Sequence, residues 1–194
     1  MRNERLPAEE RKWQIRYAAK NVFLSKGFHN TTMEDVIAES KMSKGGVYRY
    51  YKSTSDMLYD LMEDGCEYRY NIVDNFLTIN KNLDKYDAVA EMITEKILDD
   101  NELSKVYVMF LQEKQYDDNL EKLFLKLKEE TFIELKKLYE KFGFSFNYYE
   151  YDFLTDFMNS LILGREVLTA KNSFSKNRVV LKNFIYDYLK NLEE

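Results

Sequence analysis

The sequence predicts an all-α protein with two helical domains, and three observations carry this prediction. Apolar residues recur at three- and four-residue spacing along most of the 194-residue chain, which is the period of an amphipathic helix. One proline and six glycines are too few for a loop-rich β-protein. An apolar fraction of 45% can bury a sizeable core in one or two domains. We expect an N-terminal domain at residues 1–52 and a second domain at residues 53–194.

Composition and motifs argue against several classes of protein. Cys66 is the single cysteine, so an internal disulfide is ruled out and the reducing cytoplasm is the expected location. With one cysteine and one histidine, His29, we expect no metal site and no cofactor. We interpret His29 as a solvated turn residue rather than a phosphate contact. No run approaches the roughly 20 apolar residues of a membrane span, and the charged N-terminal stretch lacks the apolar core of a signal peptide. The common catalytic motifs are absent, so we expect no enzyme.

The net charge of −5 is unevenly distributed. Residues 1–52 carry a net charge of +5, and residues 53–194 carry −10. A basic segment on an acidic body is typical of a nucleic-acid footprint confined to one end of a molecule. Chance clustering on a solvated surface is the alternative.

The N-terminal domain is expected to begin with a helix from Ala8 to Ser25. Ile15 and Val22 lie on its apolar stripe, and Gly27 is expected to cap its C-terminal end.

Two short helices with a turn between them are expected next. Thr31 and Glu34 fit a capping box at the start of the first helix. Ser43 is the N-cap candidate of the second helix, which we expect to continue through Lys52.

Two glycines mark the second short helix as a recognition element. Gly45 and Gly46 lie in its first turn, where each gives up about 1 kcal/mol relative to alanine. A partner that approaches the backbone closely would explain both glycines. A nucleic-acid groove bordered by Lys44, Arg49 and Lys52 is the expected partner.

This segment resembles the DNA-binding helix-turn-helix of TetR-family transcriptional regulators. The matching positions are Thr31-Thr32-Met33, Ile37-Ala38, Ser40-Lys41-Met42-Ser43, Gly45, Val47-Tyr48, Tyr50-Tyr51, Thr54 and Leu58. The resemblance covers about the first quarter of the chain. Together with the glycine argument, it indicates the following DNA-binding residues: Thr32, Ser43, Lys44, Gly45, Gly46, Tyr48, Arg49, Tyr50, Lys52 and Thr54.

Three residues depart from the family pattern. Lys41 replaces the glycine of the turn, so this lysine must tolerate a left-handed or distorted backbone. Tyr50 replaces a histidine and exchanges a nitrogen donor for a phenolic one. Thr54 stands where the family usually has lysine, which weakens one phosphate contact or moves it to a hydroxyl.

The second domain is expected to consist of six helices. They lie near residues 53–78, 84–99, 103–115, 118–142, 147–171 and 175–192. The helix that opens at Ser53 passes into this domain without a linker, so a tilt of its far end is expected to move the recognition helix. The stretch FGFSF, residues 142–146, is expected to be a connecting loop.

Aromatic side chains are frequent, with 16 tyrosines and 13 phenylalanines in the chain. In the second domain they can line a cavity for a planar or lipophilic effector, although each also suits ordinary core packing. Glu113 lies beside aromatic residues and could receive a lipophilic cation, or it could be a surface residue. The candidate ligand-binding residues are Met62, Cys66, Tyr70, Tyr107, Phe110, Glu113 and Asn159.

The helix expected at residues 147–171 carries two adjacent apolar stripes, more than an intramolecular core of this size needs. The resemblance implies that the last two helices pair with those of a second copy. Burial of both stripes in the monomer core is the alternative. The candidate interface residues are Phe153, Phe157, Leu161, Phe184 and Tyr188.

The predicted function is sequence-specific binding of double-stranded operator DNA by a homodimer, with repression relieved by a small-molecule effector. One rival is an all-helical carrier or enzyme whose basic N-terminus does not read DNA. A second rival is a non-specific DNA-packaging protein, which the acidic body disfavours.

Overall fold

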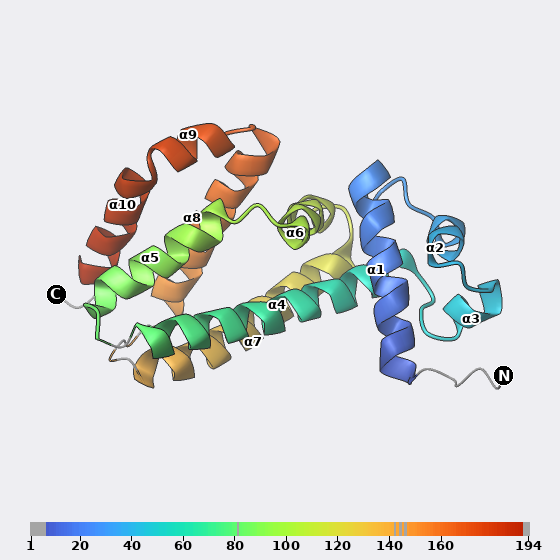
Figure 1. Ribbon diagram of the computed structural model, residues 1–194, viewed down its shortest axis with the longest axis horizontal. Helices are drawn as coiled ribbons and strands as arrows, with labels where there is room; N and C mark the ends of the chain where they lie inside the picture. The colour runs from blue at the N-terminus through green and yellow to red at the C-terminus, as the bar shows by residue number, and fades with distance from the viewer. Residues whose placement is uncertain (1–6, 81, 142, 144, 146, 192–194) are drawn as a thin grey trace. The chain divides into compact units, whose positions relative to one another are not determined.

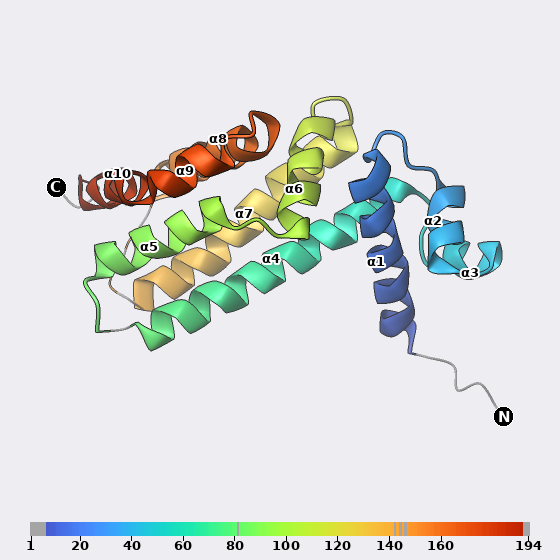
Figure 2. The same cartoon turned by 45° about the horizontal axis from the view of Figure 1, so that its top comes forward.

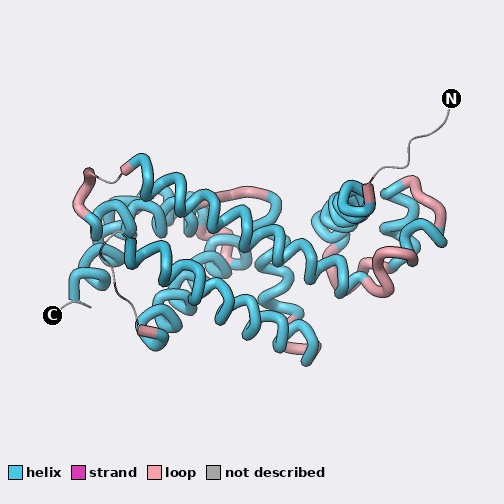
Figure 3. The backbone as a smooth tube through the Cα atoms, turned by 90° about the horizontal axis from the view of Figure 1, so that it is seen from below, coloured by secondary structure: helices cyan, strands magenta, loops and turns pink. Residues whose placement is uncertain are grey.

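The computed structural model describes residues 7–80, 82–141, 143, 145 and 147–191. Within these residues the chain forms helices joined by turns and loops and contains no strand (Figure 3). The helices are α1 (Ala8–Lys26), α2 (Met33–Ser40), α3 (Lys44–Tyr48), α4 (Thr54–Ile79), α5 (Lys85–Leu98), α6 (Glu102–Glu113), α7 (Asp118–Lys141), α8 (Tyr148–Val167), α9 (Lys171–Lys176) and α10 (Arg178–Asn191). The prediction of an all-α fold is confirmed.

The chain divides into two compact units. Unit 1 consists of residues 1–65 and 105–124, and unit 2 of residues 66–104 and 125–194. α4, α6 and α7 therefore each contribute residues to both units. The division describes packing alone, and the functional boundary between residues 52 and 53 remains a prediction.

Unit 1 is built around the packing of α1 on α2, with α3 against α2 (Figure 1). The apolar stripe of α1 is buried as predicted at Ile15, Ala19, Val22 and Phe23, and Ala18 is buried beside it. Gly27 ends this helix at φ 82° and ψ 156°, a conformation that glycine adopts without strain. Its role as the cap of the first helix is confirmed.

The start of α2 differs from the prediction by one residue. Thr32, not Thr31, is the N-cap, and it forms a capping box with Asp35 rather than Glu34. The hydroxyl of Thr31 instead donates to the carbonyl oxygen of Gly27 at 2.8 Å. Thr31 is buried and closes the turn after α1, which removes its side chain from the helix start.

Unit 2 is organised around α5, which packs against α10, α8 and α9 (Figure 1 and Figure 2). Buried residues of α4, α5, α7, α8 and α10 form its core. Ala90, Ile97, Leu138 and Leu189 are fully buried there.

The end of α8 also departs from the prediction. The helix stops at Val167, and Thr169 adopts a left-handed conformation with φ 53°. The short α9 follows, and α10 begins at Arg178. A left-handed non-glycine residue cannot continue a right-handed helix, so the chain changes direction here. Of the predicted 142–146 loop, residues 142, 144 and 146 lie outside the described residues.

None of the described helices combines the length and the apolarity needed to cross a membrane. The described residues also contain no cluster of three or more histidine, cysteine, aspartate or glutamate side chains able to hold a metal ion.

Candidate nucleic-acid interface

A left-handed turn joins α2 to α3. Lys41 has φ 56° and ψ 23°, and its backbone N–H donates to the carbonyl oxygen of Ala38 at 3.3 Å. The left-handed backbone expected of Lys41 is therefore confirmed. Ser43 follows as the N-cap of α3, and its hydroxyl accepts the N–H of Gly46 at 3.2 Å. This cap is also as predicted.

α3 is shorter than expected, ending at Tyr48 rather than continuing through Lys52. The N–H of Tyr50 donates to the carbonyl oxygen of Val47 at 2.9 Å, so the last turn tightens to an i−3 bond. Val47 is fully buried and Tyr51 is 2% exposed. These two side chains anchor the segment on unit 1 while its other face remains exposed.

The two glycines of α3 differ in their surroundings. A Cβ atom on Gly46 would lie 3.1 Å from Oγ of Ser43 and 3.5 Å from Cε of Met42. The helix cap and its neighbour therefore explain Gly46. A Cβ atom on Gly45 would meet no described atom within 4 Å. Packing within the described chain thus gives no reason for glycine at this exposed position.

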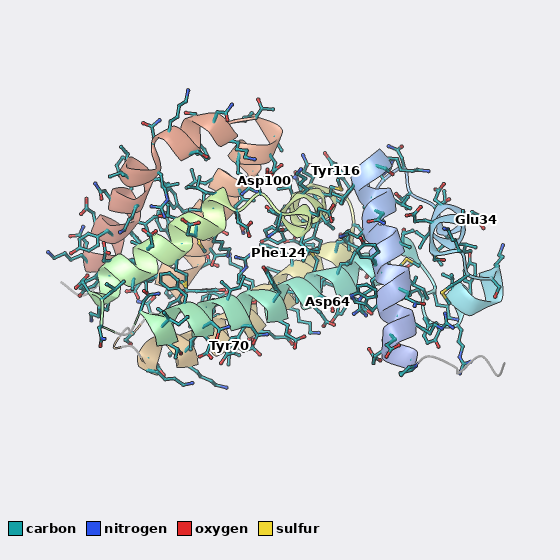
Figure 4. The ribbon with its side chains drawn as sticks, in the orientation of Figure 1. Glu34, Asp64, Tyr70, Asp100, Tyr116 and Phe124 are labelled. Carbon is teal, nitrogen blue, oxygen red and sulfur yellow. The ribbon has the colours of Figure 1, made fainter. Side chains whose placement is uncertain are left out.

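Three exposed basic side chains border α3. Nζ of Lys44 lies 3.4 Å from Oε1 of Glu34, which Figure 4 labels on α2. Arg49 lies 5.8 Å from the ring centre of Tyr50, and Nζ of Lys52 donates to the carbonyl oxygen of Tyr48 at 2.5 Å. Interactions of this kind at an exposed surface contribute little, so phosphate oxygens can replace them at small cost.

The remaining residues predicted to bind DNA lie on the same segment. Thr32 is exposed, but its hydroxyl belongs to the capping box of α2. Tyr48 and Tyr50 are half-buried at the end of α3, and Thr54 is the first residue of α4. The structure thus places the whole predicted set between the start of α2 and the start of α4.

A partly buried network that was not predicted from the sequence ties this segment to α4. The hydroxyl of Tyr51 donates to Oδ2 of Asp60 at 2.7 Å. Nε of Arg16 on α1 lies 2.8 Å from Oδ2 of Asp64, and Nη1 lies 3.6 Å from Asp60 (Asp64 is labelled in Figure 4). Burial, followed by the bond to Asp60, raises the pKa of the Tyr51 hydroxyl. In the sequence, the one sign of this network is the pair Asp60 and Asp64, which lie four residues apart in the segment that forms α4.

Unit 2 contains a cavity of about 300 Å³ between α4, α5, α7 and α8. Its wall is mostly apolar and includes Ile72, Phe76, Met92, Ile93, Leu135 and Met158. Four charged residues also line it: Arg69, Glu95, Lys96 and Asp99. The cavity is at the small end of the range for ligand sites.

None of the residues predicted to bind ligand lines this cavity. Met62, Tyr107, Phe110 and Glu113 belong to unit 1. Phe110 is fully buried, with its ring centre 6.2 Å from that of Tyr107 and 6.3 Å from that of Phe124. Phe110 therefore packs against other aromatic rings inside unit 1.

The other three candidates belong to unit 2 but lie outside the cavity wall. Tyr70 packs at the edge of the core, and Asn159 is buried within α8. Sγ of Cys66 lies 3.7 Å from the hydroxyl of Thr131. One signal in the sequence that could have located the cavity is Lys96, a basic residue beside the apolar stripe of α5.

The predicted dimer residues form an apolar face on α8 and α10. Phe153 is 58% exposed and Phe184 is 65% exposed, whereas Phe157, Leu161 and Tyr188 are half-buried. A groove of about 350 Å³ runs across this face, and its walls include Phe153, Phe157, Phe184 and Tyr188. Large exposed aromatic side chains that line a groove mark an interaction surface.

The comparisons with known proteins agree with this geometry. Residues 15–61 match the model of a family described as "Bacterial regulatory proteins, tetR family". A relative from Bacillus subtilis (strain 168), named "Uncharacterized HTH-type transcriptional regulator YfiR", is 48% identical over 59 residues, which are 30% of this chain and 29% of the relative. The chain thus matches less than a third of the length of this relative.

Solved structures extend the likeness of fold to nearly the whole chain. GusR of Salmonella enterica superposes with a TM-score of 0.73 at 15% identity, covering 97% of this chain and 100% of GusR. A protein from Mesorhizobium loti MAFF303099, described as a TetR-family transcriptional regulator, superposes with a TM-score of 0.65 at 15% identity, covering 96% of each chain. The sequence match to the tetR family is thus confined to residues 15–61, and the likeness of the rest of the chain to these solved structures is one of fold.

Proposed function

We propose that this protein is a sequence-specific DNA-binding transcriptional regulator that acts as a cytoplasmic homodimer. The observation that carries the proposal is Gly45, which is exposed on α3 with open space where a side chain would lie. A duplex that approaches the α3 backbone would explain the glycine, and the flanking cations suit its phosphates. The matching family is described as regulatory proteins and the relative as a transcriptional regulator, and neither as an enzyme, which supports the same proposal.

The proposal assigns different tasks to residues on one face. Lys44 and Lys52 contact phosphates and set the position of α3 on the duplex. Arg49 reaches a base edge, where its guanidinium can form two hydrogen bonds with a guanine. Tyr51, Arg16 and Asp60 do not touch DNA but hold α3 and the start of α4 in place.

The apolar face of α8 and α10 supports the homodimer. A second copy would cover Phe153 and Phe184, which are exposed in the single chain. A two-fold dimer presents two recognition helices, and these reach successive major grooves when they are about 34–36 Å apart. The operator is therefore expected to contain two half-sites in inverted repeat.

The cavity in unit 2 supports regulation by a small molecule. In this proposal an effector favours a state of the dimer in which the recognition helices no longer fit the half-sites, so repression is relieved. Such an effector acts through its different affinity for the two states. Bound operator must then weaken effector binding by the same factor by which the effector weakens operator binding.

The experiment that tests this function is selection of bound duplexes from a random pool, followed by competition. The purified chain is mixed with labelled selected duplex, and unlabelled selected or random duplex is added at equal concentration and fixed salt. We expect the selected duplex to compete at least about a thousandfold better than random DNA. Equal competition would contradict sequence-specific binding and favour the carrier or packaging alternatives.

A further inference from the structure

The charged residues on the wall of the unit 2 cavity are not equivalent. Glu95 on α5 forms an ion pair with Arg178 on α10, so its carboxylate already has a cationic partner. The carboxylate of Asp99 accepts the side-chain N–H of Asn101 at 2.6 Å. Lys96 forms no hydrogen bond or ion pair within the described part of the chain.

Lys96 lies in surroundings that disfavour its charge. Burial lowers its pKa well below the usual range, and the nearby guanidinium of Arg69 lowers it further. Cys66 acts weakly in the opposite direction. An ammonium group beside an apolar wall without an acid partner destabilises the folded protein. An anion bound between Lys96 and Arg69 would relieve both the desolvation and the repulsion.

The rest of the cavity is suited to a hydrocarbon group. Aliphatic and aromatic side chains from all four surrounding helices face it, including Ile72, Met92, Leu135 and Met158. The cavity wall therefore combines the neighbouring cations Lys96 and Arg69 with a mostly apolar lining, while its two carboxylates, Glu95 and Asp99, already have partners. A lipophilic cation, the effector class suggested by Glu113, would meet the wrong sign of charge here.

We propose that the unit 2 cavity binds a monocarboxylic acid with a medium-length hydrocarbon tail, holding the carboxylate at Lys96 and Arg69 and the tail among the apolar side chains. This inference rests on the proposed function for the role of the ligand as effector. Binding itself requires no DNA.

Isothermal titration calorimetry of the full chain tests the charge requirement. The probes are decanoate, decanol and decyltrimethylammonium, which share one tail and differ in head group, each kept below its micelle-forming concentration. We expect decanoate to bind at least about tenfold more tightly than decanol, because a charge-assisted hydrogen bond is stronger than a neutral one. Binding of the cation as tight as that of decanoate, or no binding of any probe, would overturn the inference.

Two variants locate the head group. Lys96→Met keeps an apolar side chain of similar length but removes one of the two charges, so the affinity for decanoate should fall markedly toward that for decanol, with Arg69 still in place. The affinity for decanol should stay unchanged. Lys137→Met is the matched control, because Lys137 is exposed on α7 and does not line the cavity. Undiminished decanoate binding by Lys96→Met, with a melting temperature at or above that of the unmodified protein, would overturn the inference.

The experiments can contradict the carboxylate site and the proposed DNA-binding function independently of each other. A protein that binds a selected duplex but not decanoate would contradict the carboxylate site and leave DNA regulation intact. A protein that binds decanoate through Lys96 but lacks a preferred duplex would contradict the regulator and leave the carboxylate site intact.

Discussion

The guanidinium group of Arg165 on α8 donates a hydrogen bond to the carbonyl oxygen of Ile97 near the end of α5, with 2.7 Å between Nη1 and O. It also donates to the carbonyl oxygen of Asp99 and to the hydroxyl of Ser104. Its Nε lies 2.8 Å from Oε1 of Glu166. Arg165 is 1% exposed, so one buried side chain joins α8 to the segment that follows α5.

Arg165→Met is expected to destabilise the protein, because the carbonyl oxygen of Ile97 would remain buried without a donor. We expect the free energy of unfolding to fall by about 2–4 kcal/mol. Urea denaturation measures the change. Lys190→Met, at an exposed position of α10, is the control and should change the stability by less than about 0.5 kcal/mol. A midpoint for Arg165→Met equal to that of the control would show that the network contributes nothing.

Lys44→Ala and Arg49→Ala are expected to weaken DNA binding in different ways. Loss of the Lys44 phosphate contact should weaken all duplexes similarly and lower the salt slope by about one. Loss of Arg49 should cost about 1–3 kcal/mol, mainly on the selected operator, and relax the preference at one base pair. Fluorescence anisotropy over a salt series separates the two effects. Equal losses on operator and random DNA for both variants would refute this division of tasks.

Phe184→Asp is expected to produce a folded monomer. Phe184 is already 65% exposed in the single chain, so the carboxylate harms the fold little, but in a dimer it would be buried without a partner. Val179→Asp is the matched control, because Val179 is 68% exposed but shares its helical stripe with Asn183 and Asp187.

Analytical ultracentrifugation measures both variants. We expect Phe184→Asp to sediment as a monomer that no longer binds operator, and Val179→Asp to remain a dimer. A dimeric Phe184→Asp would place the interface elsewhere.

Lys96 is expected to make stability rise with pH. Its pKa in the folded protein is lowered, so between that pKa and about 10.4 the unfolded chain binds more protons and stability increases with pH. The neighbouring groups are Cys66, Arg69, Glu95, Asp99, Tyr139 and Tyr151. Burial raises the pKa of both tyrosines, to about 12 for Tyr151, so they stay neutral across this window.

Lys96→Met should therefore be more stable than the unmodified protein at neutral pH, and the difference should shrink as the pH approaches about 10. Urea denaturation at several pH values, with Lys137→Met as the control, measures it. A difference that does not change with pH would show that Lys96 has an ordinary pKa.

The local features of the fold were the most predictable from sequence. Lys41 stands at a position where the family has glycine, and this substitution alone indicated a left-handed residue. The caps at Ser43 and Gly27 followed from residue type and spacing. The capping box at α2 was placed one residue early because Thr31 and Thr32 both fit the pattern. The choice between them depends on the bond of Thr31 to Gly27, a tertiary feature of the turn.

The cavity was not predictable because its wall combines four helices, and α6 separates the pair α4 and α5 from the pair α7 and α8 in the sequence. Phe110 and Glu113 seemed suitable as an aromatic and an acidic residue one turn apart, but Phe110 packs against Phe124. Lys96 is visible in the sequence as a basic residue beside the apolar stripe of α5, but its place on a cavity wall depends on α4, α7 and α8 around it. The apolar face of α8 and α10 was easier to recognise, because the excess of apolar stripes is visible within a single helix.

Gly45→Ala provides the most direct test of the claim that DNA approaches the backbone of α3. The added methyl group meets no described atom within 4 Å, so the free energy of unfolding should stay equal or rise by up to about 1 kcal/mol. Gly46→Ala is the contrasting variant, since its Cβ would press on the Ser43 cap at 3.1 Å and reduce stability. Affinity for the selected duplex is measured beside stability. The account predicts that Gly45→Ala is fully folded and binds operator at least about tenfold more weakly, a loss of about 1.4 kcal/mol. Wild-type affinity of a folded Gly45→Ala would contradict it.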